Sequence, residues 1–147
     1  MKEAYHYTES GLDNVYLYNI SVVQDIKGEK VIYVPKINQL HKVIAEGIIY
    51  KKGLISVQEI KFLRTEMGLK QSELSGLLGK EAQAVGRWER GDNSIDKTTD
   101  TLLRLLVAQY LNLEINPKHI SELVAIKAAN DNINIDGTDN NYKLMVA

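Results

Sequence analysis

The pattern of apolar and polar residues changes near residue 36. Before that point the chain has short runs rich in β-branched and aromatic residues, at 15–18 (VYLY) and 30–34 (KVIYV). Such runs are typical of β-strands. Residues 25–29 (DIKGE) supply a turn, so we predict a hairpin over about residues 22–34. Pro35 cannot donate to a strand ladder and ends it.

From Ile37 onward the apolar spacing is helical. Ser56 and Glu59 have the spacing of a capping box, and Gly68, Gly79 and Gly91 follow helical segments as stop signals. The pattern predicts a first helix over residues 37–50 and five more over about 56–67, 71–78, 82–89, 98–111 and 118–129. Residues 130–147, rich in Asn and Asp, are interpreted as a mobile tail.

The two short helices expected at 71–78 and 82–89 are too small to be independent units. Separated by a glycine and a few loop residues, they match a helix-turn-helix, whose second helix enters the DNA major groove. Apolar spacing predicts a seam between them, with the tryptophan packed in the core instead of acting as a base-stacking wedge. The seam residues are Leu74, Leu78, Val85 and Trp88.

The outer face of the second short helix is small and polar. Gln83 can pair with adenine, and Arg87 can pair with guanine, through their major-groove edges. Ala82 and Gly86 would let the helix backbone approach the groove, and Ala82 could touch a thymine methyl. These four residues are therefore the predicted base contacts.

Composition and charge narrow the class of protein. The chain has 147 residues, of which 44% are hydrophobic, and this suits one small domain with an appended subdomain. The net charge is −1, but residues 51–91 carry eight Lys or Arg against five Asp or Glu. A basic centre between acidic flanks fits a surface that faces phosphates, although a solvated helix pair gives the same excess.

Several functions have no support in the sequence. The absence of cysteine excludes disulfides, thiol catalysis and cysteine zinc sites, and His6, His41 and His119 lack metal-ligand spacing. We therefore expect no metal and no cofactor, and the chain offers no catalytic grouping of an enzyme. Apolar runs are too short for a membrane span, and no signal-peptide core begins the chain, so we expect a cytoplasmic protein.

Residues 63–91 (LRTEMGLKQSELSGLLGKEAQAVGRWERG) resemble the Xre/Cro-repressor type of helix-turn-helix domain, and the similarity extends over about residues 56–112. The resemblance implies base contacts by the positions of Ala82, Gln83 and Arg87. It also implies a phosphate contact by Gln71, an ion pair between Arg64 and Glu89, and an approach of the loop holding Asp92, Asn93 and Ser94 to the DNA backbone.

This chain departs from that family pattern at three positions. Lys70 replaces the commoner Ser or Thr, and Lys80-Glu81 replaces a small capping residue. Lys70 and Lys80 could add phosphate contacts, whereas Glu81 and Asp92 would oppose them. The predicted backbone contacts are Lys70, Gln71, Lys80, Arg90 and Asn93, with Lys51 and Lys52 as further phosphate-facing candidates.

A second resemblance covers the N-terminal segment. Residues 5–17 (YHYTESGLDNVYL), ahead of a helix and an Xre domain, look like the MqsA-like group of antitoxin regulators. Such proteins are implied to bind their own promoter and a co-encoded toxin. The cysteine zinc site of that group does not carry over, because this chain has no cysteine. The alternating tyrosines at 5, 7, 16 and 18 predict a half-buried sheet face, with a partner surface as the alternative.

Together these features predict an α+β fold that is mainly α: a five-helix Xre-type helix-turn-helix bundle with a small N-terminal β-rich subdomain and its helix. The expected boundaries are 1–52, 53–129 and a tail at 130–147. The predicted function is that of a DNA-binding regulator, an antitoxin and autorepressor. It would act as a homodimer on double-stranded operator DNA, with helices 37–50 and 118–129 as candidate dimer surfaces. A protein-interaction module that lost DNA affinity, or a phage-type repressor without a toxin, are the alternatives.

Overall fold

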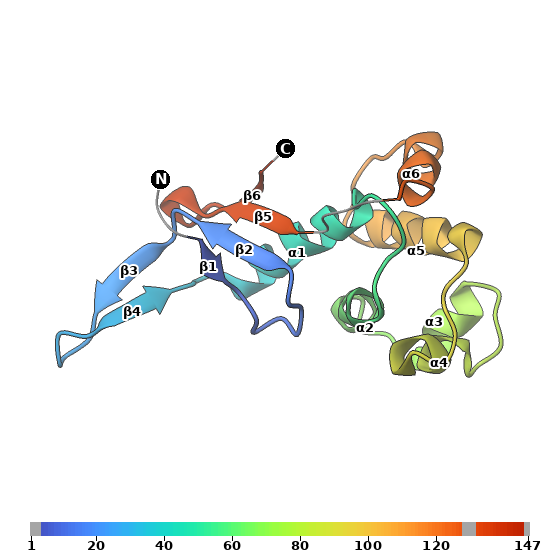
Figure 1. The fold of residues 1–147 in the computed structure, drawn as a ribbon, viewed down its shortest axis with the longest axis horizontal. Helices are drawn as coiled ribbons and strands as arrows, with labels where there is room; N and C mark the ends of the chain where they lie inside the picture. The colour runs from blue at the N-terminus through green and yellow to red at the C-terminus, as the bar shows by residue number, and fades with distance from the viewer. Residues whose placement is uncertain (1–3, 128–131, 146–147) are drawn as a thin grey trace. The chain divides into compact units, whose positions relative to one another are not determined.

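The computed structural model describes residues 4–127 and 132–145 (Figure 1), which divide into two compact units. Of the described residues, unit 1 contains 4–44 and 132–145, and unit 2 contains 45–127. The fold is mixed α+β, as predicted. The described residues form six α-helices: five follow residue 56, and the sixth is the helix expected at 37–50. The helices are α1 (Ile37–Ile49), α2 (Val57–Glu66), α3 (Gln71–Leu77), α4 (Ala84–Arg90), α5 (Lys97–Tyr110) and α6 (Pro117–Val124).

Unit 1 is built on a four-stranded sheet of strand order β1-β2-β5-β6. The central strands β2 and β5 are parallel, with Leu17 opposite Ile135, and the outer pairs are antiparallel. Leu17 and Ile135 are fully buried, and Tyr7 donates or accepts a hydrogen bond at 2.9 Å with His41 of α1. The strands of this sheet are β1 (Tyr5–His6), β2 (Val15–Tyr18), β5 (Ile133–Asp136) and β6 (Lys143–Leu144).

The expected tail is the main error of the sequence interpretation. Residues 133–136 form β5, and Ile133 and Ile135 are buried in the sheet. Alternation of isoleucine with Asn and Asp gives the strand one apolar and one polar face, and pairing with β2 supplies its backbone hydrogen bonds. Residues 130, 131, 146 and 147 of the predicted tail lie outside the described residues. The predicted division at residue 52 also differs, because unit 2 begins at residue 45, within α1.

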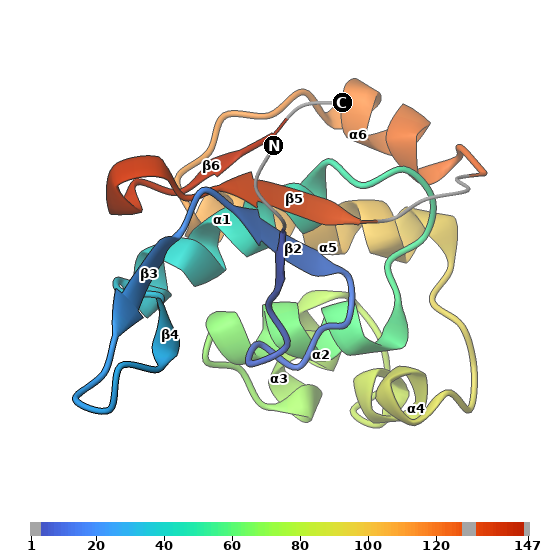
Figure 2. The same cartoon turned by 60° about the vertical axis from the view of Figure 1, so that its left-hand side comes forward.

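The predicted hairpin is present as a separate two-stranded antiparallel sheet of β3 (Ser21–Gln24) and β4 (Lys30–Tyr33). Its turn is ordered by Asp25, whose carboxylate accepts hydrogen bonds from the amides of Lys27 and Glu29, each at 2.9 Å. Gly28 takes a φ of +79°, which favours glycine, and its N–H donates to the Asp25 carbonyl. Figures 1 and 2 both show this hairpin extending from unit 1.

Unit 2 contains the end of α1 and helices α2 to α6. The capping box at the start of α2 is confirmed: the Ser56 hydroxyl accepts from the Glu59 amide, and the Glu59 carboxylate accepts from the Ser56 amide. The helix expected at 118–129 is shorter than predicted: α6 ends at Val124, and residues 128 and 129 lie outside the described part. Its apolar residues Ile120, Leu123 and Val124 are buried within the chain.

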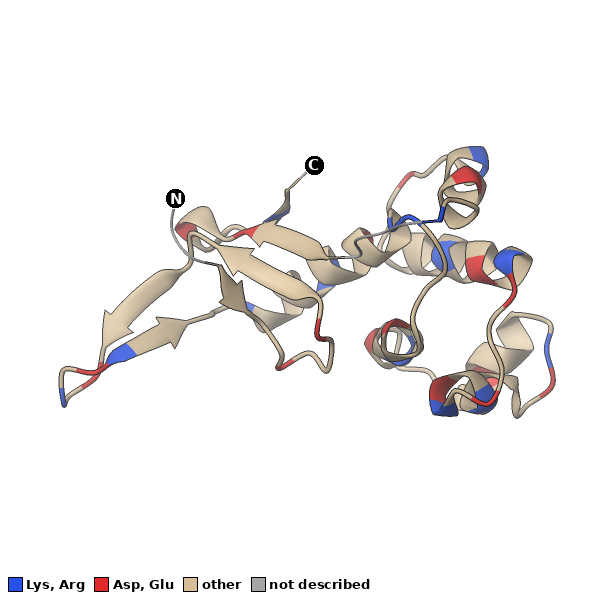
Figure 3. Cartoon of the chain, viewed as in Figure 1, with Lys and Arg blue, Asp and Glu red and all other residues tan. Residues whose placement is uncertain are grey.

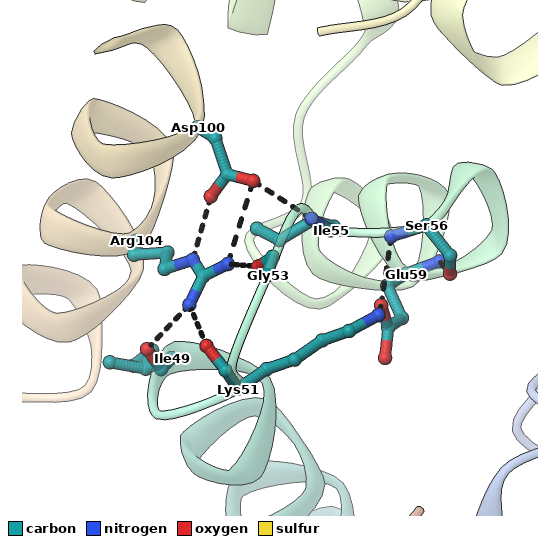
Figure 4. A network of polar contacts seen from close by, with 8 residues as sticks. All are labelled: Ile49, Lys51, Gly53, Ile55, Ser56, Glu59, Asp100 and Arg104. Atoms are coloured by element: carbon teal, nitrogen blue, oxygen red, sulfur yellow. Dashed lines mark hydrogen bonds and ion pairs between the residues drawn. The ribbon is translucent and has the colours of Figure 1, made fainter. Parts of the chain in front are cut away.

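A buried ion pair organises the loop between α1 and α2 (Figure 4). Arg104 and Asp100, one turn apart on α5, are both fully buried, and Arg104 Nε lies 2.6 Å from Asp100 Oδ1. The Arg104 guanidinium also donates to the carbonyls of Ile49, Lys51 and Gly53. Asp100 accepts from the Ile55 amide at 2.8 Å. The pair therefore satisfies backbone groups left over at the end of α1 and in the following loop.

Candidate nucleic-acid interface

The turn that joins α3 to α4 is short and internally bonded. Gly79 adopts a φ of +71°, and the Lys80 amide donates to the Ser75 carbonyl at 2.9 Å. Ser75 is fully buried; its hydroxyl donates to the Gln71 carbonyl and accepts from the Val85 amide at 3.0 Å. The serine thus satisfies an amide in the first turn of α4, where no side-chain cap is present.

The predicted apolar seam between the two helices is confirmed. Leu74 and Leu78 are buried on α3 and just beyond its end, and Val85 and Trp88 are buried on α4. Trp88 is only 5% exposed, so it packs in the core as predicted and is unavailable as a base-stacking wedge. This packing fixes which face of α4 remains outside.

Arg64, Glu89 and Gln71 form one polar network that holds α2, α3 and α4 together. Arg64 donates to both carboxylate oxygens of Glu89, at 2.7 and 3.0 Å, so the ion pair implied by the family resemblance is present. Gln71 Nε2 donates to the same carboxylate at 3.0 Å, and Arg64 also donates to the Leu69 carbonyl. A bidentate pair of this kind fixes orientation as well as distance.

A shallow, open hollow lies between the beginnings of α3 and α4. It brings together six of the nine residues predicted to contact DNA, while Lys80, Arg87 and Asn93 are not among its lining residues. Ser72 lines it as well, and the sequence interpretation missed this residue because an exposed serine after the first helical position has no distinctive spacing. The lining residues are Lys70, Gln71, Ser72, Ala82, Gln83, Gly86 and Arg90.

Gly86 occupies a different place from the one expected. It is buried, and a Cβ added to it would lie 3.1 Å from Gln71 Oε1 and 3.2 Å from Arg90 Nη1. Gly86 is therefore covered by two side chains and is not itself exposed to a base in this conformation. Its lack of a side chain lets Gln71 and Arg90 lie close against α4.

The helix that carries the outer face begins later than predicted. α4 starts at Ala84, so Ala82 and Gln83 belong to the turn that leads into it, with Gln83 as the N-cap residue. Both are exposed, and Arg87, one turn along α4, has a side chain 44% exposed. Gln83 and Arg87 thus present hydrogen-bonding groups on the outside of the start of α4.

Cations and acids alternate on this surface, as Figure 3 shows around α4. Arg87 lies 3.6 Å from Glu81, Arg90 lies 3.1 Å from Asp92, and Lys80 lies 3.5 Å from Asp96. All three pairs are exposed, and such pairs contribute little to folding stability. Each nevertheless gives the cation an internal partner that competes with a DNA phosphate.

Of the other predicted phosphate contacts, Lys51 has a buried side chain and the rest are exposed. Lys51 is wrong as a candidate, because its side chain is only 8% exposed and its ammonium lies 2.6 Å from Glu59. Asn93 is exposed in the loop after Gly91, as the family resemblance requires for a backbone contact. Lys52 and Lys70 are exposed as well.

The ion pair of Arg64 and Glu89 predicts acid sensitivity of the domain. Burial opposes ionisation of Glu89, but hydrogen bonds from Arg64 and Gln71 outweigh it and hold the pKa of Glu89 below its ordinary value. A lowered carboxyl pKa stabilises the folded state above the unfolded pKa of about 4.3, and this stabilisation is lost as the pH falls through the folded value. The free energy of unfolding of the wild type should therefore decrease on acidification below about pH 5.

Glu89→Gln should be less stable than the wild type at pH 7 and should have a flatter dependence on pH below 5. Urea denaturation at a series of pH values measures the free energy of unfolding of each protein and its slope against pH. Glu122→Gln, which removes an exposed carboxylate on α6, is the control and should follow the wild type. Equal slopes for all three proteins would contradict the role given to the Glu89 carboxylate.

Comparison with known families decides what this arrangement is. Residues 60–116 match the helix-turn-helix family, a span that runs from Ile60 in α2 through α5 to the residue before Pro117. Residues 60–116 form a helix-turn-helix domain. No curated protein and no solved structure matches the chain.

The helix-turn-helix domain assigns roles to the helices already described. Within this domain, α3 is the first helix of the helix-turn-helix motif and α4 is the second, the one that enters the major groove in proteins of this architecture. The match indicates a DNA-binding transcriptional regulator. Over the described residues, no group of three or more metal-ligating side chains occurs, and none of the helices has the length and apolarity needed to span a bilayer.

Proposed function

We propose that this chain is a sequence-specific transcriptional repressor that binds a palindromic operator as a homodimer in the cytoplasm. The main support for this proposal is the exposure of Gln83 and Arg87 at the start of α4, within a helix-turn-helix domain. The ion pair of Arg64 and Glu89 fixes α4 against α2 in that domain. In a dimer, two such helices reach successive major grooves about 34 Å apart.

We assign two roles to the residues of the interface: some read the sequence through base contacts, and others position the domain through phosphate contacts. Gln83 and Arg87 contact base edges, and Ala82 lies beside them against a thymine methyl. Because Gly86 has no side chain, Gln71 and Arg90 can pack over it, and Gly86 does not contact a base itself. Phosphate contacts come from exposed residues around these base-contacting side chains, namely Lys70, Gln71, Lys80, Arg90 and Asn93.

We further propose that the repressor is the antitoxin of a toxin–antitoxin operon and represses its own promoter. This finer proposal is supported by the likeness of residues 5–17 to MqsA-like regulators. Co-expression with the protein encoded by the adjacent reading frame, followed by co-purification and a growth assay, tests it. Relief of growth inhibition with formation of a complex is expected, and a neighbouring protein that is neither toxic nor bound contradicts it.

A gel-shift titration with DNA from upstream of the coding region tests the DNA-binding proposal. At low and at physiological salt we expect binding to that DNA to be tighter than to a scrambled duplex, because base contacts survive salt better than phosphate contacts do. Equal binding to both duplexes would contradict sequence-specific recognition. No binding at either salt concentration would favour the alternative of a protein-interaction module, to which the paired cations on α4 also point.

Glu81→Gln should raise affinity for DNA of any sequence. It removes a negative charge that repels phosphates, and this repulsion does not depend on the base sequence. It also releases Arg87, which lies 3.6 Å from Glu81, for base contacts on the operator. Because exposed pairs of this kind are worth at most about 1 kcal/mol, an increase of up to about fivefold is expected. Fluorescence anisotropy with a labelled duplex measures it, and Glu122→Gln is a charge-matched control on α6 that should leave affinity unchanged. Unchanged or weaker binding by Glu81→Gln would place Glu81 outside the interface.

A further inference from the structure

The hairpin of β3 and β4 exposes an unusual share of apolar surface. All eight residues of its strands are exposed, although four of them are Val or Ile and one is Tyr. Of the 14 exposed large apolar side chains among the described residues, six lie within residues 22–33. They are Val22, Val23, Ile26, Val31, Ile32 and Tyr33, from 39% to 106% exposed.

This apolar surface lies on both faces of the ribbon. Cross-strand partners share a face, so Val22 and Ile32 lie on one face and Val23 and Val31 on the other. A lone two-stranded ribbon is marginally stable in water, whereas three or more strands reach independent stability. The hairpin therefore gains from pairing with further strands.

The free edge of β3 is open to such pairing. Its sequence Ser-Val-Val-Gln has no charge and no proline, and over the described residues no strand other than β4 pairs with it. The outer strands of the four-stranded sheet, β1 and β6, offer few backbone groups for such pairing, because each is only two residues long. Longer apolar edges without charge or proline are the ones that template pairing with another chain, whereas very short edge strands are protected from it.

The hydrogen-bond pattern fixes how a second strand can add to this edge. The Asp25 amide donates to the Glu29 carbonyl, so the Val23–Val31 pair two residues earlier is also hydrogen bonded. The N–H and C=O groups of Val22 and Gln24 consequently point away from β4. An antiparallel second copy of β3 meets them when Val22 lies opposite Gln24 of that copy and Val23 lies opposite its own counterpart.

We propose that β3 of one protomer pairs antiparallel with β3 of a second copy of this chain, across a two-fold axis at Val23, to form a four-stranded sheet. An uncharged edge can pair with itself without placing like charges opposite each other. The pairing aligns Val31 and Val23 of both protomers in one row on one face. The inference deepens the proposed function, since it rests on the homodimer named there.

Other occupants fit the structure less well. The tip of the hairpin carries Asp25 and Glu29 against Lys27 and Lys30, so it has no positive excess to attract DNA. The helices first considered as dimer surfaces are also unsuitable. In α1 the apolar residues at 40, 44, 48 and 49 are 0% exposed, and Ile37 at its first position is exposed by itself; Ile120, Leu123 and Val124 of α6 are at most 8% exposed.

Disulfide formation tests the register directly, because the chain contains no cysteine of its own. In the full-length protein, Val23→Cys should form a covalent dimer under mild oxidation, since opposite residues of a non-hydrogen-bonded pair have Cα atoms about 4.5 Å apart, within disulfide range. Leu77→Cys on α3, where the residue is 55% exposed against 46% for Val23, is the control and should remain monomeric on a non-reducing gel. Equal crosslinking of the two variants would overturn the pairing.

Sedimentation equilibrium without DNA provides the second measurement. The wild type should be dimeric at micromolar concentration, and Val23→Lys should weaken association at least tenfold, because two lysines would face each other on the axis. Tyr110→Lys, on α5, should stay dimeric. A wild-type monomer, or a dimer broken by Tyr110→Lys and not by Val23→Lys, overturns the inference. Circular dichroism checks that each variant folds.

These outcomes can be separated from failure of the proposed DNA binding. A dimer that crosslinks at position 23 but ignores operator DNA would support the pairing and contradict the repressor. A dimer that binds operator DNA and is unaffected by substitutions at position 23 would support the repressor and contradict the pairing. A monomer in which Val23→Lys weakens only DNA binding would assign the hairpin to nucleic acid and overturn the pairing.

Discussion

Replacing Arg104 with methionine should destabilise the protein by about 3–5 kcal/mol, the usual cost of removing one partner of a buried ion pair. Methionine keeps much of the side-chain volume but leaves the Asp100 carboxylate buried without its cation. It also leaves the carbonyls of Ile49 and Gly53 without their guanidinium donor. Urea denaturation followed by circular dichroism measures the loss.

Two controls make this prediction specific. Arg90→Met removes an arginine whose side chain is 62% exposed and should change the free energy of unfolding by less than about 0.5 kcal/mol. Asp100→Asn with Arg104→Met should be more stable than Arg104→Met alone, because the neutral amide oxygen can still accept from the Ile55 amide. If Arg104→Met matched Arg90→Met, the buried pair would not hold the loop between α1 and α2.

The second large effect concerns recognition. Arg87→Ala and Gln83→Ala should each cost roughly 1–3 kcal/mol of operator binding, and the double variant about 3 kcal/mol or more, close to a hundredfold loss. The loss should fall on the operator and leave binding to scrambled DNA nearly unchanged. Competition titrations of each variant with both duplexes measure this ratio.

Lys80→Ala is the contrasting variant, because it removes a proposed phosphate contact. It should weaken binding to all sequences about equally and reduce the slope of log affinity against log salt by about 1. Both cations have an exposed acidic neighbour, Asp96 for Lys80 and Glu81 for Arg87. Lys80 makes no proposed base contact, so the loss on the operator should be smaller than that of Arg87→Ala. Equal losses for both variants on every duplex would contradict the division between reading and positioning.

The helices of the helix-turn-helix domain could be predicted because several local signals agree there. The capping box at Ser56 and Glu59, the glycines at 68, 79 and 91 and the apolar seam all describe the same elements. The sequence pattern predicts the start of α4 two residues too early, because the side chains of Ala82 and Gln83 are compatible with a helix although both residues lie in the turn. Boundaries depend on backbone hydrogen bonds that composition does not encode.

Long-range pairing explains most of what the sequence did not reveal. The Asn- and Asp-rich composition around Ile133 and Ile135 favours a loop, and only pairing with the distant β2 makes this segment a strand. The spacing of its two isoleucines was the signal that could have found it.

Buried charge was the other feature missed. Asp100 and Arg104 lie on the same helical stripe as Leu103 and Val107, so two opposite charges on an apolar face could have predicted a buried pair. The carbonyls that accept from Arg104 lie at the end of α1 and in the following loop, about fifty residues earlier, and no local pattern identifies them. The pairing of Lys51 is likewise invisible in the local pattern, because the spacing of Ser56 and Glu59 predicts a capping box and gives no sign that Glu59 also binds Lys51.

Methylation interference on the upstream DNA tests the central claim most directly. Methylation of guanine at N7 blocks the major-groove contact that an arginine makes, so bound duplexes should be depleted of N7-methylguanine at one position in each half-site. Arg87→Ala should lose that interference while Lys80→Ala keeps it. Interference confined to the minor groove at adenine N3, or a pattern identical in the wild type and Arg87→Ala, would contradict recognition by the outer face of α4.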